Sequence, residues 1–594
     1  MSAPQLHIFE FGDFRVEAHT RRLLHRGDAV PLTPKVFDTL LYLVENRGKV
    51  VEKDDLMRAV WPDTVVEENN LNQNISTLRR VLGESRGENR FIATIPGKGY
   101  RFIAPVGLAP AALGAIPTRV TLAALPFENL SADPEREYLA DGLTEETIAT
   151  LGQIDPHHLS VIGRTSVMSY KRTTKSLAEI GHELDAAYLI ESSIRAEGGH
   201  LRITSKLIRV SDQVQIWSAS YDSEPSSMLA FQRELSAAIA EQVHLHLSPD
   251  RLSALARRHS RNAEAYDLYL RGRHFWNQLT PPATRRAIEY FGRAAELDPS
   301  YALAWSGLAD SYCAGPINGD APPLAVWPRA KEAAANAIKA EPALAEVQTS
   351  LGFLKFWLEW DWPGAEAAFR KAVSLDPSYP LPHRMIGILL SHMGRPEEAR
   401  PAIRRARELD PLLAVHQALS SQVAFSGREY SEAVQFARQS IVVDPEFWVG
   451  YMQLAQALEQ LDQTDQALDA LTSAGRFSGG NSKVVALRGY IFAKLGRTAE
   501  AREVLRTLVA IARERYVPPY AMALVHAGLS EPDDSFEWLD RAFDLHDVHL
   551  IFLPVDPKWD PFRGDARFAA LLNRAGLPIP VLPAVRATHS PGMV

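Results

Sequence analysis

Amide, hydroxyl and guanidinium side chains gather between residues 66 and 82, in a mixture that suits contact with nucleic acid. The polar members are Asn69, Asn70, Asn72, Gln73, Ser76, Thr77, Arg79 and Arg80. Amides and hydroxyls both donate and accept hydrogen bonds, as the base edges in a major groove do, and guanidinium groups pair with phosphate oxygens. The stretch therefore predicts a surface that reads base edges and holds phosphates.

The same stretch has the periodicity of a helix. Its apolar positions are spaced 4, 3 and 4 residues apart, at Leu71, Ile75, Leu78 and Leu82. At about 100° per residue they share one stripe that packs on a core, and the polar set falls on the other side. We expect a helix over about residues 66–82. Glu67 and Glu68 lie in its first turn, where the helix dipole favours acids.

A β-hairpin is predicted directly after this helix. Two β-prone runs, Phe91–Ile95 and Tyr100–Ile103, are joined by the turn Pro96-Gly97-Lys98-Gly99. Glycine supplies the backbone conformations that such turns require. The hairpin brings two further cations, Lys98 and Arg101, beside the helix.

The upstream residues predict the elements that support this helix and hairpin. Residues 7–32 hold short alternating runs separated by Gly12-Asp13 and Gly27-Asp28, which indicates a small antiparallel sheet. Thr33-Pro34 is typical of a helix start, as N-cap and first helical residue. A second short helix, about Lys53–Val60, is expected to end at Trp61-Pro62.

The order sheet, three helices and hairpin resembles the OmpR/PhoB-type winged helix over about residues 6–105. The resemblance rests on four motifs: Leu32-Thr33-Pro34-Lys35, Val60-Trp61, Ile75–Leu82 and Thr94–Phe102. It implies that the third helix enters the major groove and that the hairpin, or wing, contacts the backbone or minor groove nearby. By position, the residues facing bases are Asn72, Gln73, Ser76 and Thr77. Those facing phosphates or orienting the helix are Asn74, Arg79, Arg80, Lys98 and Arg101.

The chain departs from that family at two places. Many members carry arginine where this chain has Ser76 and Thr77, so we expect base reading that is weaker or differently specified. Pro96 occupies a wing position that is often arginine, and Lys98 is its nearest substitute.

Composition limits the function classes. The chain has 594 residues, 46% of them hydrophobic, and a net charge of −8, which argues against a protein that binds polyanions over its whole surface. Residues 69–101 nevertheless carry a local excess of positive charge, from Arg79, Arg80, Arg86, Arg90, Lys98 and Arg101 against Glu84 and Glu88. Such a patch can direct one face to DNA. The single cysteine, Cys313, excludes an intrachain disulfide and suits the cytoplasm.

Residues 106–117 are predicted to form a linker rich in proline, alanine and glycine. One-component regulators of the ToxR type place a transmembrane helix downstream of a winged helix, so this region was weighed as a membrane span. The least charged stretch, Ile103–Thr118, is shorter than the ~20 residues that spanning needs, and Pro110 would interrupt it. We therefore expect no membrane contact.

Residues 118–250 predict an α/β or α+β domain. Strands are expected at Val120–Phe127, Leu159–Ile162, Ala187–Ala196, His200–Val210 and Val214–Tyr221, and helices at Pro134–Gln153, Leu177–Leu184 and Glu224–Leu247. The motifs Leu125–Leu130, Asp141–Glu146 and Ile216-Trp217 resemble the N-terminal domain of the translocation protein TolB, which implies no settled chemistry. The carboxylates Asp141, Glu145 and Glu146 are interpreted as dipole partners on a solvated helix start.

Residues 260–578 predict an all-α superhelix of tetratricopeptide repeats. Asp-Pro or Glu-Pro steps have prolines at 299, 342, 377, 411 and 445, at intervals of 43, 35, 34 and 34 residues. A 34-residue period is that of the tetratricopeptide repeat. We expect about seven to eight units, an insertion around Ala314–Pro323, a cap over Asp556–Leu577, and a tail at 579–594. The concave groove of such a stack takes a peptide, a protein or a copy of the chain.

Two further clusters could form sites but are interpreted otherwise. Trp357, Trp360 and Trp362 lie close in sequence and are interpreted mainly as packing. His546, Asp547 and His549 have metal-like composition without a placed third ligand, and they are interpreted as incidental surface. We expect no cofactor and no metal.

Together these features predict a multidomain, cytoplasmic, one-component transcriptional regulator. Its winged helix binds double-stranded DNA, and its repeats bind a protein or peptide partner or self-associate, with RNA polymerase a candidate partner. The chain begins about five residues before the winged helix, so we expect no receiver domain before it. The alternative is a repeat scaffold whose winged helix binds protein. No catalytic constellation is found, so we expect no enzyme.

Overall fold

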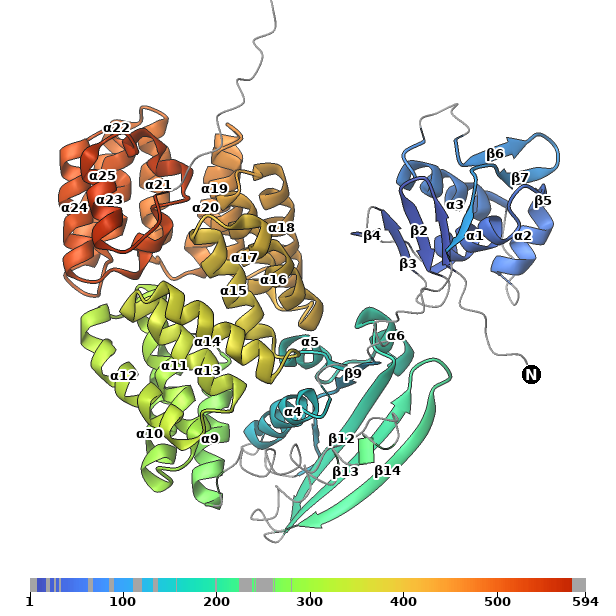
Figure 1. Cartoon of the computed structure of the whole chain (residues 1–594), viewed down its shortest axis with the longest axis horizontal. Helices are drawn as coiled ribbons and strands as arrows, with labels where there is room; N and C mark the ends of the chain where they lie inside the picture. The colour runs from blue at the N-terminus through green and yellow to red at the C-terminus, as the bar shows by residue number, and fades with distance from the viewer. Residues whose placement is uncertain are drawn as a thin grey trace, which may run out of the picture. The chain divides into compact units, whose positions relative to one another are not determined.

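The computed structural model describes residues 8–17, 22–25, 28–30, 32, 34–61, 68–84, 90–109, 120–131, 137–155, 158–197, 200–223, 235, 238–239, 241, 260, 262–278 and 280–579. The chain divides into two compact units, Met1–Thr118 and Arg119–Val594 (Figure 1). Each unit is described by itself.

The first unit opens with the predicted antiparallel sheet. Its strands are β1 (Ile8–Phe11), β2 (Phe14–Glu17), β3 (Arg22–His25), β4 (Asp28–Val30) and β8 (Gly107–Ala109), in the order β4-β3-β2-β1-β8. Strand β8 pairs with β1 through Ile8↔Ala109, so the first residues of the predicted linker complete the sheet. Residues 110–119 lie outside the described ranges.

Three helices and a small wing sheet follow, as predicted. The helices are α1 (Pro34–Glu45), α2 (Lys53–Val60) and α3 (Glu68–Val81), and the wing strands are β5 (Val51–Glu52), β6 (Ile92–Ile95) and β7 (Gly99–Phe102). The strand order is β5-β7-β6. The predicted apolar stripe of α3 is buried: no side chain in it is more than 2% exposed at Leu71, Ile75, Leu78 or Leu82. The predicted first turn at 66–67 lies outside the described residues.

Two glycines allow the wing to form. Gly97 has φ +71°, a conformation that costs L-residues with a side chain. A Cβ on Gly99 would lie 2.0 Å from the carbonyl oxygen of Val51, so only glycine lets β7 pair closely with β5.

The second unit begins with a mixed sheet. Its strands are β9 (Val120–Ala124), β10 (Glu128–Asn129), β11 (Leu159–Val161), β12 (Tyr188–Glu197), β13 (His200–Arg209) and β14 (Val214–Ser223), ordered β11-β9-β12-β13-β14, with β10 on β12. Strand β9 pairs in parallel with β11 and β12, and β12–β14 form the predicted antiparallel meander. The sheet is accompanied by α4 (Glu137–Gly152), α5 (Arg164–Met168) and α6 (Leu177–Glu183). Most of the helix predicted over 224–247 lies outside the described residues.

Paired helices then repeat along the chain, as the proline spacing predicts. The pairs are α9 (Ala263–Trp276) with α10 (Pro281–Leu297), α11 (Ala302–Asn318) with α12 (Pro323–Ala340), α13 (Ala345–Phe353) with α14 (Trp362–Leu375), α15 (Pro380–His392) with α16 (Pro396–Leu409), α17 (Ala414–Ser426) with α18 (Tyr430–Val443), α19 (Trp448–Glu459) with α20 (Thr464–Phe477), α21 (Ser482–Lys494) with α22 (Thr498–Ile511), and α23 (Pro519–Gly528) with α24 (Pro532–Asp544). The expected insertion lengthens α11 and forms the turn into α12.

The stack ends in the expected cap and contacts its own beginning. The last elements are η4 (Val548–Phe552), η5 (Pro557–Phe562) and α25 (Ala566–Arg574), and η3 (Leu354–Glu359) is a π-helical continuation of α13. Asn481 Nδ2 donates to the carbonyl of Asn318 at 2.9 Å, and Lys483 Nζ donates to that of Ile317 at 2.9 Å. These bonds join α21 to the end of α11, which closes the superhelix.

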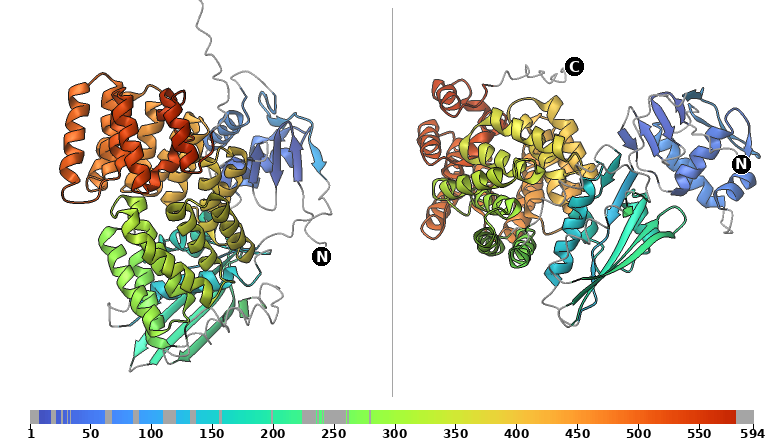
Figure 2. Two further views of the ribbon diagram at one scale, coloured as in Figure 1. Left: turned by 60° about the vertical axis from the view of Figure 1, so that its left-hand side comes forward. Right: turned by 60° about the horizontal axis from the view of Figure 1, so that its bottom comes forward.

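The middle domain and the repeats form one body with a continuous hydrophobic core. Helix α4 packs on α9 and lies between the sheet and the first repeats (Figures 1 and 2). Ser378 Oγ donates to the carbonyl of Gly152 at 3.1 Å, and the backbone N–H of Ser166 donates to Asp410 Oδ1 at 2.8 Å. Loops between repeats therefore hold the middle domain directly.

The expected solvated role of the α4 carboxylates is wrong. Asp141 and Glu146 are buried, and Glu145 forms ion pairs with Arg273 and with Arg164, the latter at 3.3 Å. Burial alone would raise the pKa of Glu145, but Arg273 and Arg164 lower it overall. The sequence places these acids at a helix start, and the reason for their burial is α9, whose side chains cover them.

The tryptophans and histidines of the later segments serve packing. Trp357 and Trp362 are buried, and the ring of Trp360 stacks on His546 with centroids 3.8 Å apart. His546 also stacks on Trp327 at 4.7 Å. The expectation that His546, Asp547 and His549 are incidental surface is wrong: Asp547 and His549 are buried and bonded to each other at 2.7 Å, and His546 is held between the tryptophan rings.

Candidate nucleic-acid interface

The described side chains on the face of α3 opposite the buried stripe are polar and uncharged. Four predicted side chains on it are exposed and one is partly exposed: Asn70, Asn72, Gln73 and Ser76, then Thr77. Asn69 and Arg80 lie within α3, but their side chains are outside the described part of the structure. The face offers amide and hydroxyl groups, which match the donors and acceptors of base edges.

Asn72 is held by the wing. Tyr100 Oη donates a hydrogen bond to Asn72 Oδ1 at 2.8 Å, which joins β7 to α3. The acceptor side of the amide is therefore occupied, and the N–H donors of Asn72 remain to meet a ligand. Tyr100 was not among the predicted site residues, because a tyrosine in a β-prone run predicts only a residue of the hydrophobic core.

Arg79 connects the helix to the wing and does not project freely toward phosphate. Its Nη2 donates to the carbonyl of Ile92 at 3.0 Å and to Thr94 Oγ1 at 2.8 Å. Its Nε lies 3.6 Å from Glu84 Oε2, and the arginine side chain is 31% exposed. The guanidinium therefore fixes β6 against the end of α3.

Glu84 is the counterpart that sequence reasoning missed. Its side chain is fully buried, and Oε1 accepts hydrogen bonds from the backbone N–H groups of Phe91 and Ile92, the second at 3.1 Å. The sequence shows Glu84 only as a negative charge that reduces the local excess. Its position directly after Gly83, which has φ +74° and ends the helix, is the one local signal of a role in the turn.

Asn74 orients the helix. Its Nδ2 donates to the carbonyl of Lys35 at 3.1 Å and to Thr39 Oγ1 at 3.0 Å, so α3 is fixed to α1. Lys35 Nζ in turn donates to the carbonyl of Val60 at 2.6 Å, at the end of α2. Of the two roles open to Asn74, contact with phosphate or orientation of α3, these bonds favour orientation.

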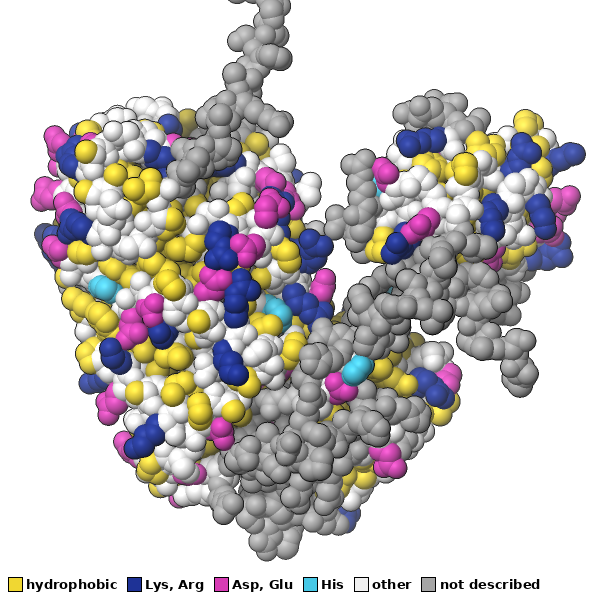
Figure 3. Space-filling model, in the orientation of Figure 1, with side chains coloured by type: hydrophobic (Ala, Val, Ile, Leu, Met, Phe, Trp, Pro, Cys, Tyr) yellow, Lys and Arg dark blue, Asp and Glu magenta, His cyan; other side chains and the backbone are white. Residues whose placement is uncertain are grey.

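The wing supplies the cations nearest to α3. Lys98 is exposed at the tip of the turn, and Arg101 is partly exposed on β7. Arg101 Nε is buried and has no hydrogen-bond partner within the described residues. Lys and Arg side chains gather at the end of the first unit where β5 and β7 lie (Figure 3). The arrangement can place positive charge on a duplex backbone while α3 faces the groove.

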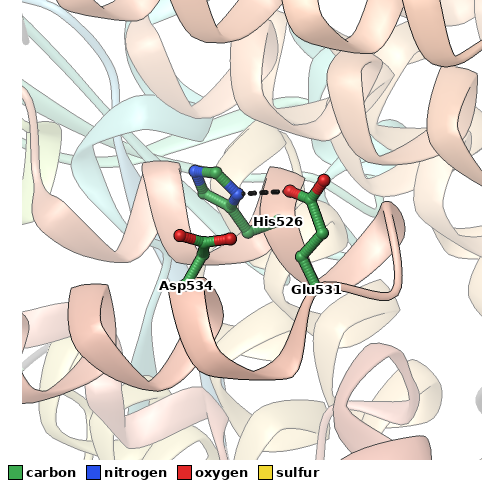
Figure 4. Close-up of side chains that lie close together, drawn as sticks. All are labelled: His526, Glu531 and Asp534. Carbon is green, nitrogen blue, oxygen red and sulfur yellow. Dashed lines mark hydrogen bonds and ion pairs between the residues drawn. The ribbon is translucent and has the colours of Figure 1, made fainter.

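Among the described residues, a further cluster has metal-ligating groups. His526 on α23, Glu531 in the turn after it and Asp534 on α24 approach one another (Figure 4). Glu531 already accepts from His526 Nδ1 at 2.7 Å and pairs with Arg502 at 2.5 Å. Because the carboxylate is neutralised by these partners, we assign no metal to this cluster.

The chain is similar to known regulators. Residues 27–102 match the family described as transcriptional regulatory protein, C terminal. The transcriptional regulator HilA of Salmonella typhi is 27% identical over 411 residues, which cover 68% of this chain and 71% of that relative. The putative adenylate cyclase 3 of Rhizobium meliloti is 31% identical over 194 residues, 33% of each chain. The solved DNA-binding domain of Escherichia coli CadC is 28% identical with a TM-score of 0.16, and the match covers 18% of this chain and 100% of that domain.

Within the described ranges, every helix is too short or too polar to cross a bilayer.

Proposed function

We infer that this chain is a DNA-binding transcription regulator, in which an OmpR/PhoB-type winged helix is fused to a middle domain and tetratricopeptide-like repeats. The observation that carries this conclusion is the face of α3, whose described side chains are polar and uncharged, held beside a lysine-tipped wing in a segment that matches a regulator family. The similarity to HilA extends well beyond this segment, over 411 residues.

We propose that α3 lies in the major groove of double-stranded DNA. Asn70, Asn72, Gln73, Ser76 and Thr77 then meet base edges, and Lys98 and Arg101 meet phosphates. Asn69 and Arg80 stay predicted contacts. Arg79 positions the wing against α3 and does not itself contact DNA, because its guanidinium is bonded to β6 and lies against Glu84.

The partner of the repeats is a separate proposal. We propose that the helical stack binds protein, either RNA polymerase or a second copy of the chain, and that the protein acts in the cytoplasm. The TolB-like identity of the middle domain and the domain boundaries stay predictions. The absence of enzymatic activity also stays a prediction. The match to the putative adenylate cyclase covers only a third of each chain, so it does not decide whether this chain has an activity.

The alternative, a repeat scaffold whose winged helix binds protein, is favoured by Ser76, Thr77 and Pro96, which replace common arginines. Chromatin immunoprecipitation of the tagged full-length chain, followed by motif extraction, separates the two functions. The regulator gives peaks centred on a shared sequence. A scaffold gives none.

A further inference from the structure

The second unit encloses a cavity of about 1200 Å³ between the middle domain and the inner helices of the repeats. Helices α4 and α5 line one side, and α11, α15, α17 and α19 line the others. Ligand pockets in proteins commonly have volumes of about 300–1,000 Å³, so the space is large enough for a small organic molecule. The closure of α21 onto α11 bounds it, which favours a compact occupant over an extended chain.

Arg384 of α15 brings a positive charge to this cavity. It makes no hydrogen bond and no ion pair with any described residue; its Nε is buried, and the side chain as a whole is partly exposed. Burial lowers the pKa of Arg384 to about 10, although the charges of Tyr379 and Asp410 oppose this shift. A partly buried guanidinium without a paired anion is costly, and carboxylate or phosphate is the group that it binds best.

Asp410 is an acid whose charge acts on Arg384, but burial raises its pKa and the two groups form no ion pair. Asp410 accepts from Ser166, Asp376 accepts from Ser378 at 2.7 Å, and Asp556 pairs with Lys558 at 2.9 Å. Burial raises the pKa of Asp310 to about 7, so this acid is partly neutral near physiological pH. The positive charge of Arg384 is therefore available to a ligand.

Two buried histidines add hydrogen-bond acceptors. His416 Nδ1 lies 3.2 Å from the carbonyl of Asp410, and His392 Nδ1 lies 2.8 Å from that of Ile388. Since a carbonyl only accepts, both Nδ1 atoms carry the proton. Burial lowers the pKa of His392 to about 4 and that of His416 well below its usual value, so both rings are neutral. Each Nε2 is then a bare acceptor, and each is buried without a partner in the described structure.

We propose that this cavity binds a small organic acid, with its carboxylate or phosphate on Arg384 and a hydroxyl or amide donor on His416, whose ring lies close enough to Arg384 for the two to interact electrostatically. The acid pairs with the guanidinium, and its donor satisfies the imidazole acceptor of His416. This proposal does not depend on contact between DNA and the first unit. Its failure would therefore leave the proposed function unaffected, and the failure of the proposed function would leave this proposal unaffected.

Isothermal titration of the full-length protein with three probes tests the proposal: citrate, glycerol 3-phosphate and inorganic phosphate. Citrate separates a carboxylate site from a phosphate site, and glycerol 3-phosphate separates an organic phosphate from the free ion. We expect saturable binding of citrate or glycerol 3-phosphate. Arg384→Gln should weaken the affinity by at least about tenfold, because this is the effect of losing a hydrogen bond to a charged group. Arg438→Gln, at an exposed arginine on α18, is the matched control and should change affinity by less than about twofold.

Thermal unfolding of the same variants guards against a folding defect. Because Arg384→Gln removes a partly buried charge that forms no ion pair with a described residue, its Tm without ligand should equal or exceed that of the wild type, and the Tm gain from the bound acid should disappear. The proposal is overturned if neither organic acid binds, if only inorganic phosphate binds, or if Arg384→Gln binds as tightly as Arg438→Gln. A lower Tm of Arg384→Gln without ligand also contradicts it, because that result makes Arg384 a structural residue.

Discussion

The Arg79 guanidinium and the Glu84 carboxylate lie 3.6 Å apart, and both side chains also bond the first residues of β6. Arg79 reaches the carbonyl of Ile92, and Glu84 reaches its N–H. Both the carbonyl and the N–H of Ile92, at the start of β6, are thus bonded to side chains at the end of α3. The helix that we propose for the groove and the wing that we propose for the backbone are therefore expected to dock as one piece.

Replacing Glu84 with alanine should loosen the wing. The substitution leaves the buried N–H groups of Phe91 and Ile92 without an acceptor, at a cost of about 1–3 kcal/mol each. Hydrogen–deuterium exchange of the full-length chain should show faster exchange over β6 and weaker DNA binding. Glu45→Ala, at an exposed acid on α1, is the control. If β6 exchanges equally in both variants, Glu84 does not hold the wing.

Lys98→Ala should reduce the salt dependence of DNA binding. A phosphate contact that is lost lowers the slope of log affinity against log salt by about 1. The measurement is fluorescence anisotropy between low and moderate salt, with Lys371→Ala, an exposed lysine on α14, as the control. An unchanged slope in Lys98→Ala removes the wing tip from the backbone contact.

Glu145→Gln should weaken the attachment of the middle domain to the first repeat. The carboxylate pairs with Arg273 and Arg164, and loss of one partner of a buried pair costs about 3–5 kcal/mol. Calorimetry of the full chain should show a lower Tm for the second unit, whereas the exposed control Glu128→Gln leaves it unchanged. Equal Tm values in the two variants would mean that the apolar core alone holds the domains together.

Acid should destabilise the repeats through His392. Its folded pKa is about 4, below the ordinary histidine value of 6.5, so the unfolded state binds more protons between these values. Stability is complete above about pH 6.5 and falls toward pH 4, by about 3 kcal/mol in total. Urea unfolding at pH 7 and pH 5 measures the loss, which should shrink in His392→Gln. The exposed control His182→Gln should lose as much stability as the wild type between pH 7 and pH 5. If His392→Gln also loses the same amount, a group other than His392 causes the pH dependence.

The sequence predicts those parts of the interface that depend on local periodicity. The buried stripe of α3 follows from the spacing of Leu71, Ile75 and Leu78, and the wing follows from two β-prone runs around Gly97. The exposure of Gln73 and Ser76 is a consequence of the same helical spacing. Whether these side chains contact bases stays a prediction.

Roles that depend on distant partners could not be predicted. Glu84 looks like any surface acid until β6 returns to present its N–H groups. Glu145 meets Arg273, which is 128 residues away in the chain, and only the packing of α4 on α9 brings them together. The cavity around Arg384 forms because the superhelix closes on itself, and no motif in the chain marks that closure.

The most direct test uses the duplex whose sequence is extracted from the chromatin immunoprecipitation peaks, here called the selected duplex. The affinity of the double variant Gln73→Ala/Ser76→Ala for this duplex is measured by fluorescence anisotropy, beside a scrambled duplex. Each lost base contact should cost about 1–3 kcal/mol on the selected sequence, while affinity for the scrambled duplex stays within about twofold. Equal affinity of wild type and variant for the selected duplex would contradict the claim that this face of α3 reads DNA.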